Sequence, residues 1–341
     1  IPSVRKNQEK NANMTIKKIL VYTFAIIALV FEGFFGVIPF LSFLIQVVII
    51  SFGSYLLLII FRRKNIQSWK TIIPRYILTV LATIGFFTSI FLTFIAYQNA
   101  VPGVVSDITL THSGQEVVFV QMSHIATADF YTQKKNTITA LSHSGYTILF
   151  EWVKPGTPEN EALFNQSIGF DFTPTLYASI ADLIGLKSQD NKELYSWVAT
   201  GSLVSVDLSL DEIMAIMGTG SVITKTGSLT DIESEILKLV PTMSHQESVF
   251  IRWMASGFLN WSIKQTDNID TLMASPTQAQ LFETIIDRRN DRIVEYITSH
   301  PKQKIAVVYS ALHFNGVYES LQKIDKNWKS IDVKNNTPYS R

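Results

Sequence analysis

The sequence predicts an α/β domain that follows a hydrophobic, membrane-spanning amino-terminal segment. Residues 19–61 contain one acidic residue, Glu32, and no Lys or Arg, which is typical of chain that lies in lipid. Beyond residue 105, short strand-like runs alternate with helix-like runs, the pattern of a sheet with helical crossovers. The expected architecture is therefore three N-terminal transmembrane helices and an extracytoplasmic α/β domain with a partly parallel central sheet and a helical insertion.

Composition restricts the classes of site and partner. The chain has 341 residues, 47% of them apolar and 17% charged, which is enough for one sizeable core. Because there is no cysteine, disulfides and thiolate metal sites are excluded, and any metal must be held by His, Asp or Glu. The net charge of +1 gives no reason to expect a nucleic-acid partner, which would need clustered Lys and Arg on a folded surface.

Three membrane spans are expected, over residues 16–35, 39–61 and 72–97. The apolar run up to residue 61 is about twice the roughly 20 residues that one crossing needs, and it is interrupted between Glu32 and Pro39. A cleavable signal peptide is the alternative for the first span. It is disfavoured because no small-residue cleavage site follows and a second apolar run comes directly after it.

Basic residues flanking the spans predict their orientation, because short loops rich in Lys and Arg stay in the cytoplasm. The residues after the third span contain no Lys or Arg until Lys134. This asymmetry places the amino terminus inside and residues from about 99 onward outside, unless the first run crosses only once, which would reverse the result. The basic flanks are Arg5, Lys6, Lys10, Lys17 and Lys18 before the first span, and Arg62, Arg63, Lys64, Lys70 and Arg75 before the third.

These segments divide the chain into three parts. Residues 1–15 are expected to be disordered, residues 16–98 to form a three-helix transmembrane anchor, and residues 99–341 to form one globular domain. Met14 is a plausible natural start, which would make the residues before it an upstream artefact. Residues 98–107 have the composition of a linker.

The globular part contains three strand-like runs. Residues 116–122 and 146–153 are separated by a helix-like run over 128–145, so we expect these two strands to be parallel neighbours. The last run covers residues 304–312. Mainly helical sequence lies before it, including residues 208–217, 229–240 and 276–300.

All three strand-like runs reach ionisable groups near their carboxyl ends. The first continues into His124, the second carries Glu151, and the last continues into His313. Because the carboxyl ends of parallel strands share one edge of a sheet, these groups are expected in one cleft. Taken alone, either histidine also fits a turn residue with one hydrogen bond. Glu151 has apolar neighbours on both sides and therefore needs a cation or a hydrogen-bond donor.

The run "DRRND" at residues 287–291 offers that cation. On a helix, Arg288 and Arg289 point about 100° apart, so at most one of them faces the cleft. The alternative is an exposed charged helix face with no role in a site.

This order of residues resembles the TraB/PrgY/GumN family, which is similar to the Tiki metalloproteases and to the group containing erythromycin esterase and the ChaN-like haem-binding proteins. The resemblance covers about residues 105–335. The family's two GxxH motifs match His124 in "QMSH" and His313 in "SALH", its glutamate matches Glu151, and its RN pair matches Arg289 and Asn290. Further matches are Tyr309, Gly316 and, in the family's acidic segment, Asp207.

The chain departs from the family at both motif glycines, which are Gln121 and Ser310 here. A side chain at either position can crowd a ligand or alter close backbone packing. These two replacements therefore bear on catalysis, whereas the histidines of both motifs are retained.

The resemblance implies a membrane-anchored, metal-dependent hydrolase, a peptidase before other types, that acts outside the cytoplasm on a peptide or small-molecule substrate. His124, Glu151 and His313 would hold a divalent ion, for which Mn, Co, Fe and Zn all suit the ligand set. Arg289 would stabilise the developing oxyanion. The candidate catalytic residues are Glu151, Arg289, Asn290 and Tyr309.

Two alternatives remain open. In a metal-free hydrolase, His124 would be a general base oriented by Glu151. In a binding protein, the same cleft would capture haem or a small peptide without chemistry. The expected partners are the lipid bilayer and the substrate or ligand; transport through the spans is disfavoured because they contain no paired charges.

Overall fold

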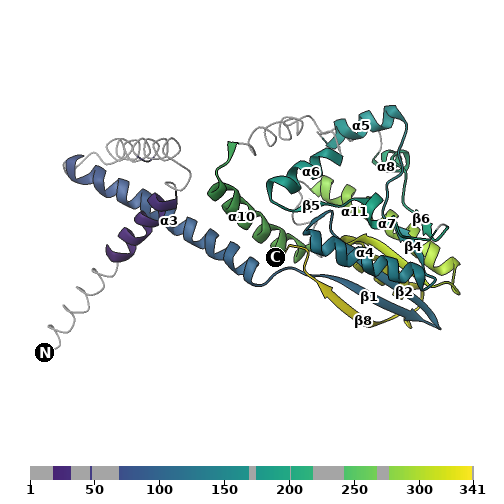
Figure 1. The fold of residues 1–341 in the computed structure, drawn as a ribbon. Helices are drawn as coiled ribbons and strands as arrows, with labels where there is room; N and C mark the ends of the chain where they lie inside the picture. Colours follow the sequence, from purple (N-terminus) through teal and green to yellow (C-terminus); the bar gives the residue numbers. More distant parts are fainter. Residues whose placement is uncertain are drawn as a thin grey trace. The chain divides into compact units, whose positions relative to one another are not determined.

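The computed structural model describes residues 18–31, 47, 69–168, 174–199, 201–217, 242–266 and 276–339. The chain forms two compact units, residues 1–97 and 98–341 (Figure 1). The predicted disordered residues 1–15, and the predicted helix at 229–240, lie outside the described residues.

The first unit contains one described helix that is long and apolar enough to cross a membrane. This stretch, Ile73–Ala100, belongs to α3 (Trp69–Ala100), and only 11% of its most apolar part is buried. It therefore differs from a core helix of a soluble protein. The helix Lys18–Phe31 is apolar but shorter, and the predicted span 39–61 lies outside the described residues except for Val47. Of the three expected spans, the described residues contain one candidate by length and composition, not three.

The second unit is built on a six-stranded mixed sheet in the order β6-β4-β7-β2-β1-β8. The four strands β6, β4, β7 and β2 are mutually parallel, and β1 pairs antiparallel with both β2 and β8. This confirms the predicted α/β class with a partly parallel sheet. The strands are β1 (Val105–His112), β2 (Gln115–Met122), β4 (Thr147–Phe150), β6 (Leu203–Val204), β7 (Ile305–Ser310) and β8 (Lys329–Asn336).

The strand order corrects one expectation. β2 and β4 are parallel but are not neighbours, because β7 lies between them and pairs with both. The residues of β7 from Ile305 to Tyr309 are all fully buried, which suits the centre of a sheet covered on both faces. β7 follows β4 by about 150 residues in the sequence. The right-handed crossover rule, applied to β2 and β4 alone, therefore cannot predict that β7 lies between them.

Three strands of this sheet, β1, β6 and β8, were absent from the prediction. β1 begins at Val105, inside the stretch expected to be a linker, and β8 is an almost entirely exposed strand with the polar sequence "KSIDVKNN". Without a buried apolar face, β8 lacks the period-two signal that marks a strand. The predicted strand 146–153 is also shorter, because β4 ends at Phe150.

Helices cover both faces of the sheet. The predicted helices at 128–145, 208–217 and 276–300 are present as α4 (Ala128–His143), α8 (Leu210–Met217) and α11 (Pro276–Ser299). The other described elements are β3 (Ile125–Ala126), α5 (Pro158–Ile168), α6 (Pro174–Leu183), β5 (Lys187–Ser188), α7 (Asn191–Tyr195), α10 (His245–Ile263), the 3-10 turn η3 (Ala311–His313) and α12 (Phe314–Ile324).

The core is divided by the sheet because side chains of a strand alternate between its faces. Val307 of β7 packs with Ile293 of α11 and Val317 of α12 on one face. Val308 packs with Ile138 of α4 on the other. The carboxyl ends of the parallel strands are left as the edge where polar groups can gather.

Candidate functional site

The carboxyl ends of the four parallel strands each lead to a polar side chain. His124 follows β2, Glu151 follows β4, Asp207 follows β6, and His313 ends the turn η3 that follows β7. Phe150 of β4 pairs with Val308 of β7, and Met122 of β2 pairs with Ser310 of β7. The carboxyl ends of these three strands are therefore level with one another. The chain thus delivers them to the same edge, as the sequence predicts.

Arg289 of α11 is the buried cation that the two carboxylates share. Its Nε and Nη2 donate to Asp207 Oδ1 and Oδ2, both at 2.7 Å, and Nη2 also donates to Glu151 Oε1 at 2.8 Å. The backbone N–H groups of Leu208 and Trp152 donate to Asp207 at 2.9 and 3.1 Å. Asp207 is therefore fully satisfied, and its bidentate contact fixes the guanidinium in one orientation.

Glu151 is held as a carboxylate. Its Oε2 accepts from the backbone N–H of Ser310 at 2.8 Å, and its side chain is 12% exposed. Burial raises the pKa of Glu151, but nearby His313, the charge of His124 and the charge of Arg289 outweigh it and hold this pKa well below 4.5. Glu151 is consequently ionised at neutral pH and is a weak base in the resting site.

His313 is buried between two oxygen acceptors. Its Nδ1 lies 2.8 Å from Asn290 Oδ1, and its Nε2 lies 3.6 Å from Glu151 Oε1. Each ring nitrogen of His313 therefore faces an oxygen acceptor.

Gly316 of α12 keeps Asn290 in place. A Cβ at position 316 would lie 2.3 Å from Asn290 Nδ2, so only glycine fits beside this amide. Asn290 in turn determines the orientation of the imidazole ring of His313. Asn290 and Gly316 are therefore positioning residues for His313.

Two tyrosines next to the cluster have hydroxyl groups without partners. Tyr309 is fully buried with its ring 5.3 Å from that of His313, edge to face, and Tyr195 of α7 is buried on the other face of the sheet. Neither hydroxyl has a hydrogen-bond partner. Burial raises the pKa of both hydroxyls. The charge of Glu151 raises the pKa of Tyr195 further, and the charge of Asp207 does the same for Tyr309, so both are neutral donors.

His124 lies at the exposed rim of the site. Its ring is 5.8 Å from that of Tyr177 of α6, and its backbone carbonyl accepts from Gln189 N at 2.8 Å. Its charge still acts on Glu151 and lowers the pKa of that carboxyl. Trp152, directly after Glu151, is exposed beside this rim.

The predicted metal ligands His124, Glu151 and His313 follow three neighbouring strands at the carboxyl edge of the sheet. Within the described ranges of the chain, His, Asp and Glu form no group of three that could hold a metal ion. Oε1 of Glu151 lies near His313 Nε2 and also accepts from the Arg289 guanidinium. The ligand set of His124, Glu151 and His313 stays a prediction.

The replaced motif glycines do not fill the cluster. Gln121 Oε1 accepts from the backbone N–H of Ser106 at 2.7 Å, so this side chain ties β2 to β1. Ser310 contributes its backbone N–H to Glu151. Sequence reasoning identified every member of the cluster except Tyr195, which the local pattern in α7 does not distinguish from a core residue.

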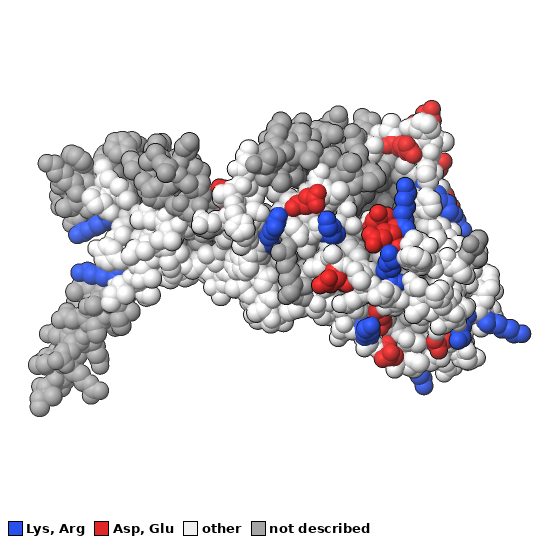
Figure 2. Space-filling model, viewed as in Figure 1, with Lys and Arg blue, Asp and Glu red and all other residues white. Residues whose placement is uncertain are grey.

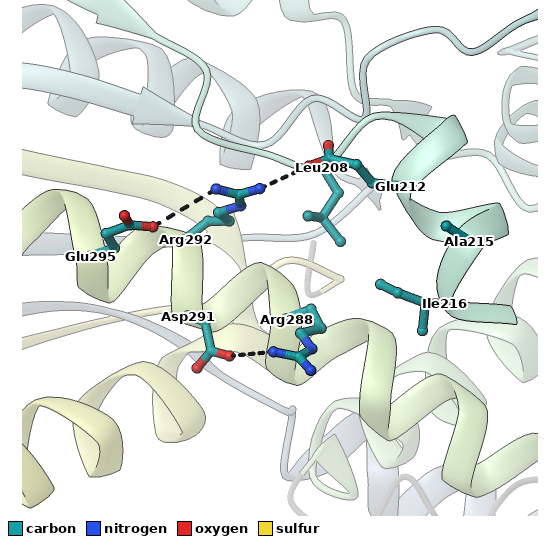
Figure 3. Close-up of a pocket in the computed structure, with 8 residues that line it drawn as sticks. All are labelled: Leu208, Glu212, Ala215, Ile216, Arg288, Asp291, Arg292 and Glu295. Carbon is teal, nitrogen blue, oxygen red and sulfur yellow. Dashed lines mark hydrogen bonds and ion pairs between the residues drawn. The ribbon is translucent and has the colours of Figure 1, made fainter.

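A surface hollow of about 530 Å³ lies on the other side of α11 (Figure 3). Its charged residues pair with one another: Arg292 with Glu212 at 2.8 Å, and Arg288 with Asp291 at 3.8 Å. Arg288 is 65% exposed here, so Arg289 is the arginine that faces the strand ends. The hollow therefore shows a solvated helix face and is separate from the buried cluster. Its lining also includes Leu208, Ala215, Ile216 and Glu295.

No protein-family model, curated protein or solved structure matches this chain. The resemblance to the TraB/PrgY/GumN family therefore depends on the motif residues and their order alone.

Proposed function

We propose that the chain is a membrane-anchored hydrolase whose site is the carboxyl edge of the sheet. The observation that supports this most is the ionised, almost buried Glu151, held between Arg289, the Ser310 N–H and His313. Perturbed carboxylates paired with imidazoles at the edge of a parallel sheet are typical of catalytic sites.

The exposed His124 is the proposed general base. An exposed imidazole can accept a proton from water, whereas Glu151, whose pKa is held well below 4.5, is too weak a base for this step. The resulting hydroxide attacks the substrate carbonyl, and the proton on His124 passes to the leaving group as the carbon–heteroatom bond breaks. No step of this proposal uses a metal ion.

The hydroxyls of Tyr195 and Tyr309 are the proposed donors to the developing oxyanion. Both are neutral, buried and without partners, so they lose no existing hydrogen bond when a ligand oxygen arrives. Arg289, which the resemblance assigns to the oxyanion, is already committed to Asp207 and Glu151. Its proposed role is to keep Glu151 charged. The exposed indole of Trp152 forms an apolar wall beside the rim, which suits a peptide or small acyl substrate.

The proposed anchoring by α3 is supported by the length, apolarity and exposure of this helix. Figure 2 shows that the described surface of α3 is mostly uncharged, whereas charged side chains gather over the sheet and α4. Because Arg62, Arg63 and Lys64 precede α3 and no basic residue follows it before Lys134, the site-bearing unit is proposed to lie outside the cytoplasm.

The test is turnover by the full chain in detergent micelles, with p-nitrophenyl acetate and a mixture of quenched fluorescent peptides as probes. His124→Gln is expected to reduce turnover about 10²–10⁴-fold, the usual contribution of a general base. The matched control is His143→Gln, at the exposed end of α4. An EDTA arm should leave turnover unchanged. Equal rates for the two variants, or no turnover of either probe, would refute the proposal.

A non-catalytic binding protein is the second candidate, favoured by the two partnerless tyrosine hydroxyls and by the otherwise complete pairing of the cluster. The probe is haemin, titrated into the full chain and followed by its absorbance. Tight binding that Tyr309→Phe weakens, in a protein that hydrolyses neither probe, would support this candidate over the first.

A further inference from the structure

One side of α10 carries an apolar stripe, of which Phe258 is exposed and the other members are half-buried. Phe250, Met254, Phe258 and Trp261 recur at spacings of three and four residues and therefore share one helix face. Phe258 is 56% exposed and lies 5.3 Å from the ring of Trp261. From residue 248 to residue 263, the only charged side chain is Arg252. A helix in contact with water on this side would normally carry charges there.

The other sides of α10 are packed against its own unit. Ala255, Leu259 and Ile263 pack with Ile184, Leu186 and Tyr339, and Ser256 Oγ donates to the Tyr339 carbonyl at 3.1 Å. Gly257 and Asn260 are buried. The helix is thus fixed in rotation, and its apolar stripe cannot turn inward.

α10 is also fastened to the chain as it leaves α3. Asn99 Nδ2 donates to the Trp253 carbonyl at 2.9 Å, and Gly103 N donates to Asn260 Oδ1 at 3.0 Å. Lys264 Nζ donates to Gln98 Oε1 at 2.7 Å and to the Val101 carbonyl. A Cβ at Gly103 would lie 2.7 Å from the Asn260 carbonyl oxygen, so this approach is close. α10 therefore lies within hydrogen-bond distance of the last residues of α3.

We propose that the Phe250–Trp261 face of α10 lies in the interfacial layer of the lipid bilayer, as a second membrane contact beside the span. This inference rests on the anchoring by α3 in the proposed function, because only then does the end of α3 mark the membrane surface. Aromatic side chains favour this layer, where one end of the ring is apolar and the other is wet. Val101 and Val104, both exposed, are further apolar residues directly after α3.

Lys264 has the position expected of an interfacial cation. It follows the last residue of α10 and reaches the residues that end α3, so its ammonium group lies where a span meets the lipid headgroups. The membrane contact would hold the site-bearing unit at a constant height above the bilayer, which restricts substrates to those that reach the membrane surface.

The absence of cysteine from the chain allows a direct depth measurement. Three single-cysteine variants of the full chain, Phe258→Cys, Ile90→Cys and Val333→Cys, would be spin-labelled and reconstituted in vesicles of phosphatidylcholine and phosphatidylglycerol. Ile90 is an exposed residue of α3, and Val333 is an exposed residue of β8. Collisions of each label with oxygen, which concentrates in lipid, would be compared with collisions with a water-soluble nickel chelate.

The expected result is lipid exposure at Ile90→Cys, water exposure at Val333→Cys and an intermediate, lipid-facing value at Phe258→Cys that does not change when the protein is diluted among more vesicles. Lipid exposure at Ile90→Cys with water exposure at Phe258→Cys would overturn the inference but leave the anchoring intact. Water exposure at Ile90→Cys would overturn both. A Phe258→Cys label that becomes water-exposed on dilution would assign the face to a second copy of the chain, and would also overturn the inference.

Discussion

Two buried charged clusters lie in the same unit and differ in charge balance and in access. At the antiparallel side of the sheet, Lys134 of α4 pairs with Asp107 of β1 at 2.5 Å, and Asn336 of β8 donates to the same carboxylate at 3.3 Å. At the carboxyl edge, Glu151 and Asp207 share Arg289. The first cluster has one charge of each sign and is closed to solvent; the second has an extra carboxylate and an open rim.

Burial and neighbouring charges oppose each other in both clusters, and their net effect on the charged group differs. Burial is the largest influence on Lys134 and lowers its pKa against the opposing effect of Asp107, so the fold penalises the lysine's charge. For Glu151 the neighbouring groups outweigh burial and favour the charged form. The first pattern is typical of an ion pair that ties elements together, and the second of a site that keeps a charge available.

The largest expected effect is at Arg289. Arg289→Met leaves two carboxylates buried without their cation, which is expected to cost about 3–5 kcal/mol of the free energy of unfolding. Urea unfolding of the full chain in detergent, followed by tryptophan fluorescence, measures this. Arg288→Met, on the exposed face of the same helix, should stay within about 0.5 kcal/mol of the parent chain. A cost as small as that of the control would show that the cluster does not need its cation.

The Lys134 cluster should behave differently when both partners are removed. Lys134→Met alone is expected to cost about 3–5 kcal/mol, because Asp107 is left unpaired. The double variant Lys134→Met with Asp107→Leu should recover most of this loss, since a balanced pair can be replaced by apolar side chains of similar volume. If the double variant is no more stable than Lys134→Met in the same urea assay, the pair stabilises the fold by more than the mutual neutralisation of its charges.

A smaller effect is expected at Gly316. Gly316→Ala forces Asn290 to move and is expected to cost about 1–3 kcal/mol, as overpacking usually does. If the proposed function holds, turnover should fall by more than the loss of folded protein explains, because His313 loses its positioning amide. Glu319→Ala, at an exposed position of α12, is the control. Unchanged stability and turnover in Gly316→Ala would remove Asn290 from its positioning role.

The smallest predicted effect concerns pH. Because the pKa of Glu151 is lower in the folded chain than its ordinary 4.5, its stabilising contribution is complete above that value and is lost as pH falls through the folded pKa. Glu151→Gln should therefore lower stability near neutral pH and reduce the loss of stability in acid. Urea midpoints of both proteins between about pH 6 and pH 3 would show converging curves. Parallel curves would contradict the lowered pKa.

The alternation of strand-like and helix-like runs was sufficient to predict the α/β class and the helices α4, α8 and α11. The ionisable residues near the ends of the strand-like runs were sufficient to predict that His124, Glu151 and His313 lie at one edge of the sheet. These features depend on side-chain periodicity and on the direction of parallel strands, which are local properties of a sequence. The exposed strand β8 and the insertion of β7 between β2 and β4 could not be predicted in this way, because pairing joins residues far apart in the chain.

The sequence by itself determined which ionisable groups would follow the strands, because chain direction alone brings parallel strand ends to a common edge. Only the tertiary structure decided how those groups pair. The rotation of α11 turned Arg289 inward and Arg288 outward, and the packing of α12 set Asn290 against His313. With the arginine beside Glu151, the cluster is a network of charged hydrogen bonds. Contacts between distant helices and strands are determined by packing and not by sequence spacing.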